Sequence, residues 1–429
     1  MLSRRAALLA PATSSIPPNP PRLIAVQRLA IPLALCVLCA GCGGSDSSKA
    51  KTKTLLIAVN APFSRTPYLG QTIANGAELA ATGITTKDGE YTLRFKRYDT
   101  GLSAGEAVAN VRRAVADGAV AIIDEGTGLN ASWRIAADAN VPICVTYQGG
   151  EGLVDPTKRP NVFRIAPTDH GTAFRLAEYL VPKKLKIALV TDDSTYGQEG
   201  LKSLRRSFAE NPEAVAMRLS VPAGAANLAP EVLRARRSHA TALLVWGEPG
   251  TIAGVVSAAR ASGWKVPVYT PATGGDPLVR QQLANHPDWV DGLTFATGRP
   301  TAEVGPGPFL SFQRLYEDRF GVYLVGVKTP DGADVVQPPD FAMYSYDFVN
   351  VLSAAIQRAG GAKDGKKVIA ALNQVSVPGA NGDHRGFNER NHEGVVDDDV
   401  YFARFEGMTY QPVKDDPLSR TLTALHQTR

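Results

Sequence analysis

The sequence predicts an α/β protein built on two doubly wound, mainly parallel sheets. Three observations support this prediction. Short apolar runs rich in β-branched residues alternate with segments of helical period, several of these runs are apolar throughout, and most of them precede residue 300. A strand that is apolar on both faces is typical of a parallel sheet covered by helices. The strands are many for a single open sheet, so we expect two sheets.

The expected strands share a core of Val, Ile, Leu or Ala and end at turn residues. They span residues 54–59, 91–99, 119–126, 142–146, 186–193, 242–248, 266–272 and 292–297. The helix after the second strand illustrates the alternation, because Ala107, Val111 and Ala114 fall on one stripe and Gly118 follows as a stop. The same helical period occurs in residues 70–83, 172–181, 196–210 and 250–263.

After residue 300 the regular alternation ends. Helical spacing predicts helices within residues 301–321, 339–361 and 364–375, and the alternating run VYFARFEG predicts a late strand. The segment before that strand is rich in turn residues. His384 and His392 flank this turn-rich loop with acidic neighbours that could hold a metal, but turn composition accounts for the same residues. No metal site is expected there.

Residues 1–41 have the organisation of an export signal. Basic residues precede an apolar run that is too short to span a bilayer. Small residues then stand immediately before Cys42, and a polar Gly/Ser/Lys tether follows over residues 42–53. This arrangement resembles a bacterial lipoprotein signal, in which the cysteine at the cleavage point is lipidated. We expect Cys42 to be that residue, although Cys39 stands where such signals usually have leucine; an uncleaved anchor and cleavage without a lipid are the alternatives.

Cys36, Cys39 and Cys42 also show a C-x-x-C-x-x-C spacing that is compatible with a metal or iron-sulfur site. Such a site needs thiolates in a folded loop and a closing fourth ligand. These cysteines instead accompany an apolar run, and the only other cysteine is Cys144. We therefore expect no metal and no cofactor, and we interpret Cys144 as a small buried apolar side chain.

Composition and motifs argue against several functional classes. The formal net charge is +5, but residues 1–41 hold four arginines and no acid, which leaves +1 on the rest of the chain. A nearly neutral body does not indicate nucleic-acid binding. The sequence has no GxxxxGK[ST], HExxH or GxSxG motif, and its six histidines are scattered. It therefore does not indicate an enzyme, and we assign no catalytic residue.

The loop GTGLNAS, residues 126–132, leaves an expected strand and enters an expected helix. A polar, glycine-rich loop in this position offers backbone N–H groups and hydroxyls to a polar ligand. Asn130 and Ser132 lie at the expected start of the helix, where they either contact a ligand or serve as N-caps.

Six segments, in chain order, resemble one family. They are NAPFSRTPYLGQTIANGAELA, AVADGAVAIIDEGTG, NVPICVTYQGG, NVFRIAPTDHG, KIALVTDDSTYGQEG and AMYSYDFVNVLSAAIQRAGG. Each is similar to a motif of the leucine/isoleucine/valine-type, or type I, periplasmic binding proteins of ABC transporters. The resemblance covers nearly all of residues 54–410.

The resemblance implies two doubly wound lobes that are joined by three strand crossings and close on a ligand between them. The crossings would fall near Ala166, Thr297 and Arg385. Lobe 1 would comprise residues 54–166 and 297–385, and lobe 2 residues 167–296 and 386–429. This agrees with the general position of ligands beyond the carboxyl ends of parallel strands, since two such edges that face each other make one cleft.

Carried over by motif position, the resemblance implies nine ligand-binding residues. Lobe 1 would supply Tyr68, Asn130, Ser132, Thr146, Tyr147 and Gln148, and lobe 2 would supply Tyr196, Glu248 and Thr273. Aromatic rings provide apolar walls or a face for a cation, hydroxyls and amides orient polar groups, and the glutamate could pair with an amine. The alternative for each residue is a structural role at the surface or the hinge.

Two departures from the family pattern bear on the ligand. Amino-acid binders commonly have a Ser/Ala/Thr-rich loop where this chain has Tyr147, Gln148 and two glycines. The acidic residue that is often present just past a later strand falls here near Ala272 and Thr273. These changes argue against a branched-chain amino acid and suggest a planar, amide-bearing or aromatic ligand.

We therefore predict a monomeric, lipid-anchored, extracytoplasmic solute-binding protein, in the periplasm or at the cell surface. Its expected partners are a small polar or amphipathic ligand, the permease subunits of an ABC transporter, and the membrane through the lipid anchor. A ligand-sensing receptor on the same fold and an extracytoplasmic hydrolase are the alternatives. The hydrolase lacks a nucleophile, base and orienting acid at motif spacing.

Overall fold

The computed structural model describes residues 52–337, 339–397 and 399–419 of the chain. The expected signal peptide, Cys42 and nearly all of the expected tether lie outside these residues. Among the described helices, none combines the length and apolar content that a membrane span requires.

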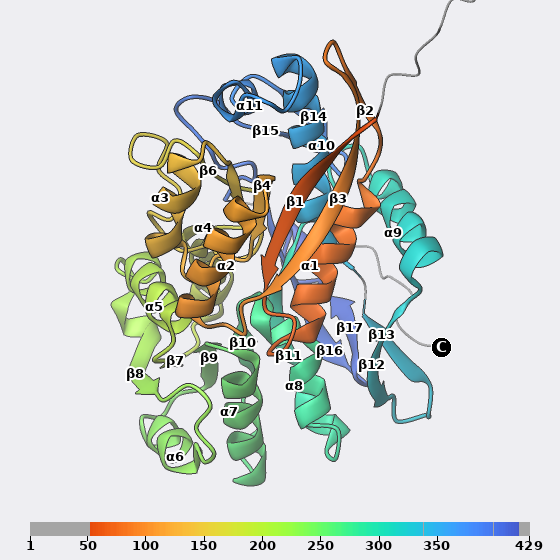
Figure 1. The fold of residues 1–429 in the computed structure, drawn as a ribbon. Coiled ribbons are helices and arrows are strands. Elements are labelled where there is room, and N and C mark those ends of the chain that lie inside the picture. The colour runs from red at the N-terminus through yellow and green to blue at the C-terminus, as the bar shows by residue number, and fades with distance from the viewer. Residues whose placement is uncertain (1–51, 338, 398, 420–429) are drawn as a thin grey trace, which may run out of the picture. The chain divides into compact units, whose positions relative to one another are not determined.

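The first sheet has six strands in the order β2-β3-β1-β4-β5-β6 (Figure 1). They are β1 Lys53–Ala61, β2 Ile84–Thr86, β3 Gly89–Asp99, β4 Ala119–Asp124, β5 Ile143–Val145 and β6 Val162–Arg164. All neighbouring pairs are parallel except β2 and β3. The central strand β1 is buried over nearly its whole length because helices cover both faces of the sheet.

The helices that accompany the first sheet come from both ends of the described chain. They are α1 Pro67–Leu79, α2 Ala104–Ala116, α3 Leu129–Asp138, α9 Gly307–Phe320, α10 Ala342–Ala359 and α11 Gly365–Leu372. The longest, α10, packs closely against α1. Gly76 permits this approach, because a Cβ atom there would lie 2.1 Å from the carbonyl oxygen of Ala342.

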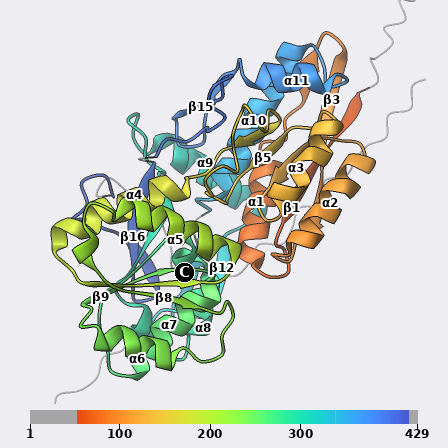
Figure 2. The same cartoon turned by 90° about the vertical axis from the view of Figure 1, so that its left-hand side faces the viewer.

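The second sheet has seven strands in the order β17-β16-β11-β10-β9-β7-β8. They are β7 Ile187–Asp192, β8 Val215–Val221, β9 Ala242–Trp246, β10 Val268–Thr270, β11 Leu293–Gly298, β16 Val400–Glu406 and β17 Thr409–Pro412. The sheet is parallel from β8 to β11 and antiparallel from β11 to β17. Figure 2 shows its helices around it: α4 Asp169–Leu180, α5 Thr195–Ser207, α6 Ala229–Arg237, α7 Pro249–Ala261 and α8 Pro277–Gln282. The predicted fold class, two doubly wound lobes, is confirmed.

Several short elements were not predicted from the sequence. They are β2, β6, β8, β17, α6, α8, the hairpin of β12 Tyr323–Lys328 with β13 Asp334–Gln337, and the hairpin of β14 Ser376–Pro378 with β15 His384–Gly386. Short 3-10 turns occur at Val181–Lys183, Pro212–Ala214, Ala272–Gly275 and Pro287–Val290. Most of these elements are too short to establish a period of their own in the sequence.

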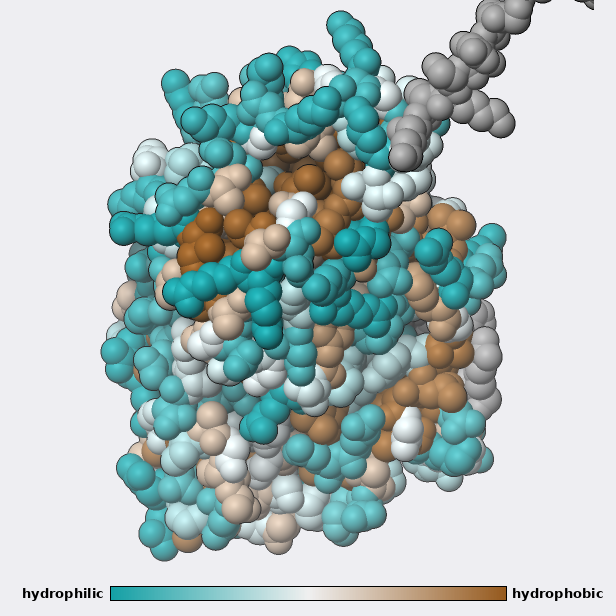
Figure 3. Space-filling view, in the orientation of Figure 1, coloured by the Kyte–Doolittle hydropathy of each residue, from teal (hydrophilic) through white to brown (hydrophobic). Residues whose placement is uncertain are grey.

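The β12–β13 hairpin contacts helices that belong to both sheets. The ring of Tyr323 lies 5.0 Å from the ring of Tyr68 on α1, and Gln281 Nε2 on α8 donates a hydrogen bond to the Val325 carbonyl at 2.6 Å. Hydrophobic residues gather on this face of the molecule around the hairpin (Figure 3), where Leu324 is 54% exposed. The hairpin therefore links α1 to α8 beside the carboxyl edges of the two sheets.

The chain passes between the two sheets three times, after β6, after β11 and after β15. The first and third passages run side by side, since Arg164 N donates to the His392 carbonyl at 2.9 Å and Gly394 N donates to the Arg164 carbonyl at 2.7 Å. His392 is buried and its Nδ1 lies 2.8 Å from the Val162 carbonyl oxygen. The lobe boundaries expected from the sequence stay a prediction.

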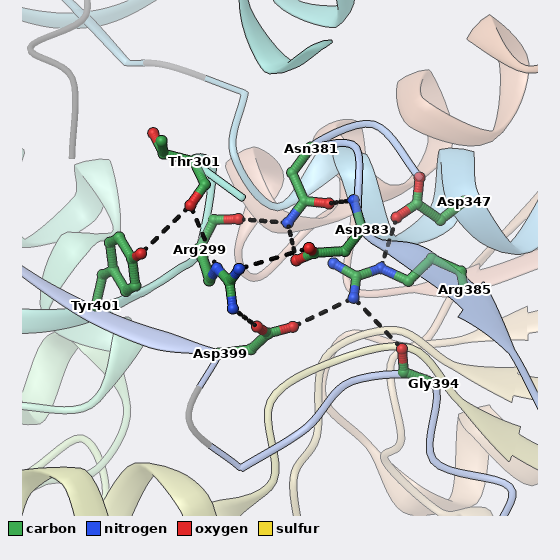
Figure 4. A network of polar contacts seen from close by, with 9 residues as sticks. All are labelled: Arg299, Thr301, Asp347, Asn381, Asp383, Arg385, Gly394, Asp399 and Tyr401. Carbon is green, nitrogen blue, oxygen red and sulfur yellow. Dashed lines mark hydrogen bonds and ion pairs between the residues drawn. The ribbon is translucent and has the colours of Figure 1, made fainter. Parts of the chain in front are cut away.

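A buried ionic network, here called the crossing network, joins the second and third passages to α10 (Figure 4). It consists of Arg299, Asp347, Asp383, Arg385 and Asp399. Arg385 Nε donates to Asp347 Oδ2 at 3.1 Å and its Nη1 donates to Asp399 Oδ2 at 3.2 Å. Arg299 Nη1 donates to the other Asp399 oxygen at 3.2 Å, and its Nη2 reaches Asp383 Oδ1 at 3.5 Å. The carboxylates in this region are therefore paired with arginines of the chain itself.

Candidate ligand cleft

Three adjoining cavities, here called the cleft, lie at the carboxyl ends of the parallel strands of both sheets. Their empty volumes are about 360, 600 and 390 Å³, part of which is open to solvent. Tyr147, in the loop after β5, lines all three. The size is within the range of small-molecule sites.

Six of the nine residues implied by the family resemblance line this cleft. They are Tyr68, Tyr147, Gln148, Tyr196, Glu248 and Thr273. The first three come from the elements of the first sheet and the last three from those of the second. The cleft is therefore lined from both sides by aromatic, amide, hydroxyl and carboxyl groups.

The other three residues do not line the cleft. Asn130 is exposed, and its Oδ1 accepts a hydrogen bond from Arg159 Nη2 at 2.8 Å. Ser132 is fully buried within α3, and the amide of Thr146 donates to the Asp124 carbonyl at 2.9 Å, which fastens the end of β5 to β4. The alternative that Asn130 and Ser132 are N-caps is wrong, because Gly128 is the N-cap of α3 and the helix begins one residue later.

The lining residues that the sequence did not predict include four acids and an aromatic ring: Glu125, Asp169, Asp276, Asp340 and Phe341. Asp276 corrects the expectation that an acid just past the later strand is replaced by Ala272 and Thr273. The chain makes a short 3-10 turn over Ala272–Gly275, and the acid follows that turn into the same cleft. The signal was present in the sequence, because Asp276 directly precedes Pro277 in the pattern of a helix N-cap.

Asp340 connects the two sides of the cleft. Its Oδ1 accepts a hydrogen bond from the Tyr68 hydroxyl on α1 at 3.3 Å, and its Oδ2 accepts one from Thr297 Oγ1 on β11 at 2.7 Å. Both carboxyl oxygens of Asp340 therefore have partners within the protein.

Two other acids occupy helix N-termini at the cleft. Asp276 Oδ1 accepts from the Leu278 amide at 2.8 Å and so caps α8. Glu248 precedes α7 without capping it through its side chain; its own amide donates to Asp192 Oδ2 at 2.7 Å. Backbone N–H groups at a helix N-terminus can bind an anion. At α7 and α8, carboxyl groups of the chain itself already lie next to these N–H groups.

The loop that carries Tyr147 and Gln148 is held from beneath by Arg164. Its Nη1 donates to the carbonyls of Gln148 and Gly150, each at 3.1 Å, while Nε and Nη2 form a bidentate pair with Glu393 at 2.7 and 2.6 Å. The side chain of Arg164 is 3% exposed. A bidentate pair of this kind fixes geometry, so the third passage of the chain helps to position the Tyr147 ring.

Burial raises the pKa of the cleft carboxyls. The pKa of Glu125 is raised to about 8, first by burial and then by the neighbouring Asp124. Burial likewise raises the pKa of Asp169 to about 7 and that of Asp276 to about 6. The pKa of Glu248 is also raised, mainly by burial. In the ligand-free protein, Glu125 and Asp169 therefore bind protons at neutral pH. A bound positive charge would favour their ionised forms and displace these protons.

The three cleft tyrosines remain protonated at physiological pH. Burial raises the pKa of Tyr68, Tyr147 and Tyr196 well above the ordinary value of a phenol. The Tyr147 ring makes an edge contact with Phe341, with ring centroids 5.7 Å apart. The cleft thus combines neutral aromatic faces and phenol donors with acidic side chains, an arrangement suited to non-covalent binding.

Comparison with known proteins supports the same assignment. The family model described as periplasmic binding protein matches residues 55–409. No curated protein matches the sequence. Among solved structures, a type 1 periplasmic binding protein from Bordetella pertussis Tohama I is similar with a TM-score of 0.71 at 21% identity, covering 82% of this chain and 97% of the other.

Two further solved structures are similar in fold and contain ligands. LivJ from Streptococcus pneumoniae, a branched-chain amino acid transporter substrate-binding protein in complex with isoleucine, has a TM-score of 0.69 at 18% identity, with coverages of 84% and 98%. A solute-binding protein of an ABC transporter from Rhodopseudomonas palustris, in complex with 4-hydroxybenzoate, has a TM-score of 0.66 at 17% identity, with coverages of 82% and 93%. The family model spans nearly all the described residues, and this chain belongs to the periplasmic binding protein family.

Proposed function

We propose that this protein is a lipid-anchored, extracytoplasmic solute-binding protein that captures a small polar or amphipathic molecule and delivers it to an ABC permease. Family membership supports an extracytoplasmic location and a binding rather than catalytic role. The isoleucine and 4-hydroxybenzoate in similar structures support a small, partly apolar ligand. The lipid anchor and the permease rest on the sequence pattern around Cys42 and on the family resemblance.

The observation that carries this proposal is the composition of the cleft. Tyr147 from one side lines the same cavity as Tyr196 and Thr273 from the other, and Tyr68 lines the adjoining cavity, which Tyr147 also lines. A ligand that contacts both sides stabilises the closed arrangement and excludes water from its own hydrogen bonds.

Ligand screening by thermal shift of the purified protein tests the proposal. A ligand that binds only the native state raises the melting temperature, and the rise grows with the logarithm of its concentration once that exceeds Kd. For any such ligand, Tyr147→Ala should weaken binding by about tenfold or more, because it removes an aromatic ring shared by all three cavities.

Tyr346→Ala is the matched control. Tyr346 is partly buried on α10 and packs against Phe312, 5.1 Å between ring centroids, without lining the cleft. It should lower stability and leave the affinity of the folded protein unchanged. Ligands whose affinity is lost in Tyr346→Ala but kept in Tyr147→Ala would show that the cleft is not the binding site.

The anchor and the transport role need separate tests. Cys42→Ser should abolish lipid labelling and membrane retention in the producing cell; labelling that persists in this variant contradicts the anchor. Uptake of the identified ligand should be lost when the gene is deleted and restored by the wild-type gene but not by the Tyr147→Ala variant. Uptake that is unchanged by the deletion would favour a receptor role on the same fold.

A further inference from the structure

The charge of the cleft lining is one-sided. Five carboxyl side chains line the three cavities: Glu125, Asp169, Glu248, Asp276 and Asp340. Among the described residues that line them, there is no lysine, arginine or histidine. A ligand carboxylate would meet carboxyl groups and would find no cation to pair with in this lining.

Three arginines act on the cleft acids, but none of them lines the cavities. Arg164 is committed to Glu393 and to loop carbonyls behind Asp169. Arg280, beyond Asp276, donates to the Met408 carbonyl at 3.1 Å and to Gln337. Arg65 is exposed in the loop before α1, where its charge acts on Glu248 from outside the cavity lining.

The largest of the three cleft cavities, about 600 Å³, is also lined by residues whose buried polar atoms have no partners within the described residues. Glu125 is 0% exposed, and its Oε2 has no hydrogen-bond partner in the described part of the protein. The same holds for the hydroxyl oxygens of Thr66 and Thr273, which line the same cavity. Thr66 is the N-cap of α1, yet its side chain does not cap that helix. Three buried polar groups at one cavity therefore have hydrogen-bonding capacity that the protein does not use.

Aromatic rings line the same cavity as these polar groups. Tyr147 and Tyr196 line the same cavity as Glu125, and Phe341 packs against Tyr147 in the adjoining one. Ring faces attract cations, and ammonium groups supply several N–H donors to carboxylates and hydroxyls. The carboxyls do not converge as a metal set, since no group of three or more potential ligand side chains is arranged for a metal ion within the described residues. An organic cation fits this lining better than a metal ion.

We propose that the ligand of this cleft is an organic amine that carries a positive charge and no net negative charge. This inference rests on the proposed solute-binding function and specifies its substrate class. A zwitterionic amino acid should bind less well, and an aromatic or aliphatic carboxylate without an amine should bind least.

Binding of such a cation should release protons. Besides burial, neighbouring charges act on the pKa of each cleft acid. Asp124 acts on Glu125, and Arg280 acts on Asp276. Arg164, Glu199 and Glu151 act on Asp169, while Asp192, Asp193 and Arg65 act on Glu248. Because the pKa of Glu125 is about 8 and that of Asp169 about 7, a bound cation favours their ionised forms and lowers both pKa values. Affinity for an amine should therefore rise as pH increases from about 6 to about 8.

The test uses sets of probes that share a carbon skeleton and differ in charge. The first set is tyramine, tyrosine and 3-(4-hydroxyphenyl)propionate, which are an amine, a zwitterion and an acid. The second set, in the same order, is 2-methylbutylamine, isoleucine and 3-methylpentanoate. Methylammonium and acetate serve as small fragments that fit any cavity of this size. Calorimetry or thermal shift of the full protein should rank the amine above the zwitterion and the zwitterion above the acid. Glu125→Gln should weaken amine binding by about tenfold or more. The exposed Glu106→Gln on α2 is the matched control and should leave it within about twofold.

The outcomes separate this inference from the proposed function. Equal or stronger binding of the acid in any set overturns the inference, as does an effect of methylammonium no larger than that of sodium. Acid binding that strengthens as pH falls would show that the carboxyls act as neutral donors. In each of these cases, binding of any probe that depends on Tyr147 leaves the solute-binding proposal standing. If no probe of any charge binds, both proposals fail.

Discussion

The crossing network and the cleft both bury carboxyl groups, but they satisfy them differently. In the network, Asp347 and Asp399 are 0% and 3% exposed at their side chains and share the guanidinium of Arg385. In the cleft, Glu125 is equally buried, yet its neighbours Thr100 and Thr127 are uncharged: Thr100 Oγ1 donates to its Oε1 at 3.4 Å, and its Oε2 has no partner within the described residues.

This difference distinguishes carboxyl groups that stabilise the fold from a carboxyl group that is available to a ligand. A buried carboxylate with an internal arginine contributes to the position of three chain segments, and removal of its partner leaves an uncompensated charge. A buried carboxyl without such a partner lowers its cost by holding a proton, as the raised pKa of Glu125 shows. Burial also raises the pKa of Asp347, to about 6, although Arg385 opposes the rise. Burial alone therefore does not distinguish the two regions, whereas the presence of an internal cation in the network and its absence at Glu125 do.

The largest expected effect is on the paired region. Arg385→Ala should reduce the free energy of unfolding by about 3–5 kcal/mol, because it leaves Asp347 and Asp399 buried without their shared cation. Urea unfolding at neutral pH measures this loss. Arg404→Ala, which removes an exposed pair with Glu406, is the control and should cost at most about 1 kcal/mol. Similar losses of unfolding free energy in the two variants would show that the buried pairs contribute no more than an exposed pair.

An effect of opposite sign is expected in the cleft. The native pKa of Glu125 lies above the unfolded value, so its contribution to stability is full at low pH and is lost as pH rises toward about 8. Glu125→Gln should therefore stabilise the ligand-free protein by roughly 1 kcal/mol or more at about pH 9 and have little effect at about pH 4. Thermal unfolding across this pH range measures the difference.

Asp399→Asn is the matched comparison for that experiment. Burial raises the pKa of Asp399 too, although Arg385 and Arg299 oppose the rise, but its removal leaves both arginines without the carboxylate that they share, so it should destabilise the protein at about pH 9. If both substitutions stabilised the protein, or if neither did, the crossing network and the cleft would not differ in how they accommodate a buried carboxylate.

The smallest effect is expected at Asn130. The family resemblance places it in the ligand site, but its side chain is exposed and bonded to Arg159. Asn130→Ala should leave the affinity for any cleft ligand within about twofold and stability within about 0.5 kcal/mol. A tenfold loss of affinity, measured by calorimetry, would restore the sequence-based assignment.

The sequence predicts the fold where periodicity is long and burial is two-sided. The helix α2 is an example, since Ala107, Val111 and Ala114 are buried on the expected stripe. The β12–β13 hairpin was missed although Asp331 and Gly332 mark a turn between two apolar runs. Its strands are short, and their position depends on contacts with Tyr68 and Gln281 that no local pattern encodes.

For the site, residue type and loop position predict which loops reach the cleft but not which side chains face it. Tyr147 and Gln148 follow β5 and line the cavities, whereas Thr146, one residue earlier, belongs to the strand pairing. Glu125 was overlooked because acids after a strand are usually solvated. Only the packing of the loops after β3, β4 and β5, which carry Thr100, Glu125 and Gln148, shows that this acid is enclosed.

The strand order of the second sheet has a consequence for synthesis and export. β11 pairs on one side with β10, but its other neighbour is β16, with Thr297 opposite Tyr401. All of α9, α10 and α11 must emerge before that neighbour exists. Until then, β11 presents an open edge that can recruit another chain, and closing it requires a slow, long-range pairing. A chain that ends before Val400 would therefore aggregate through β11, so completion of translation is itself a step in the folding of this lobe.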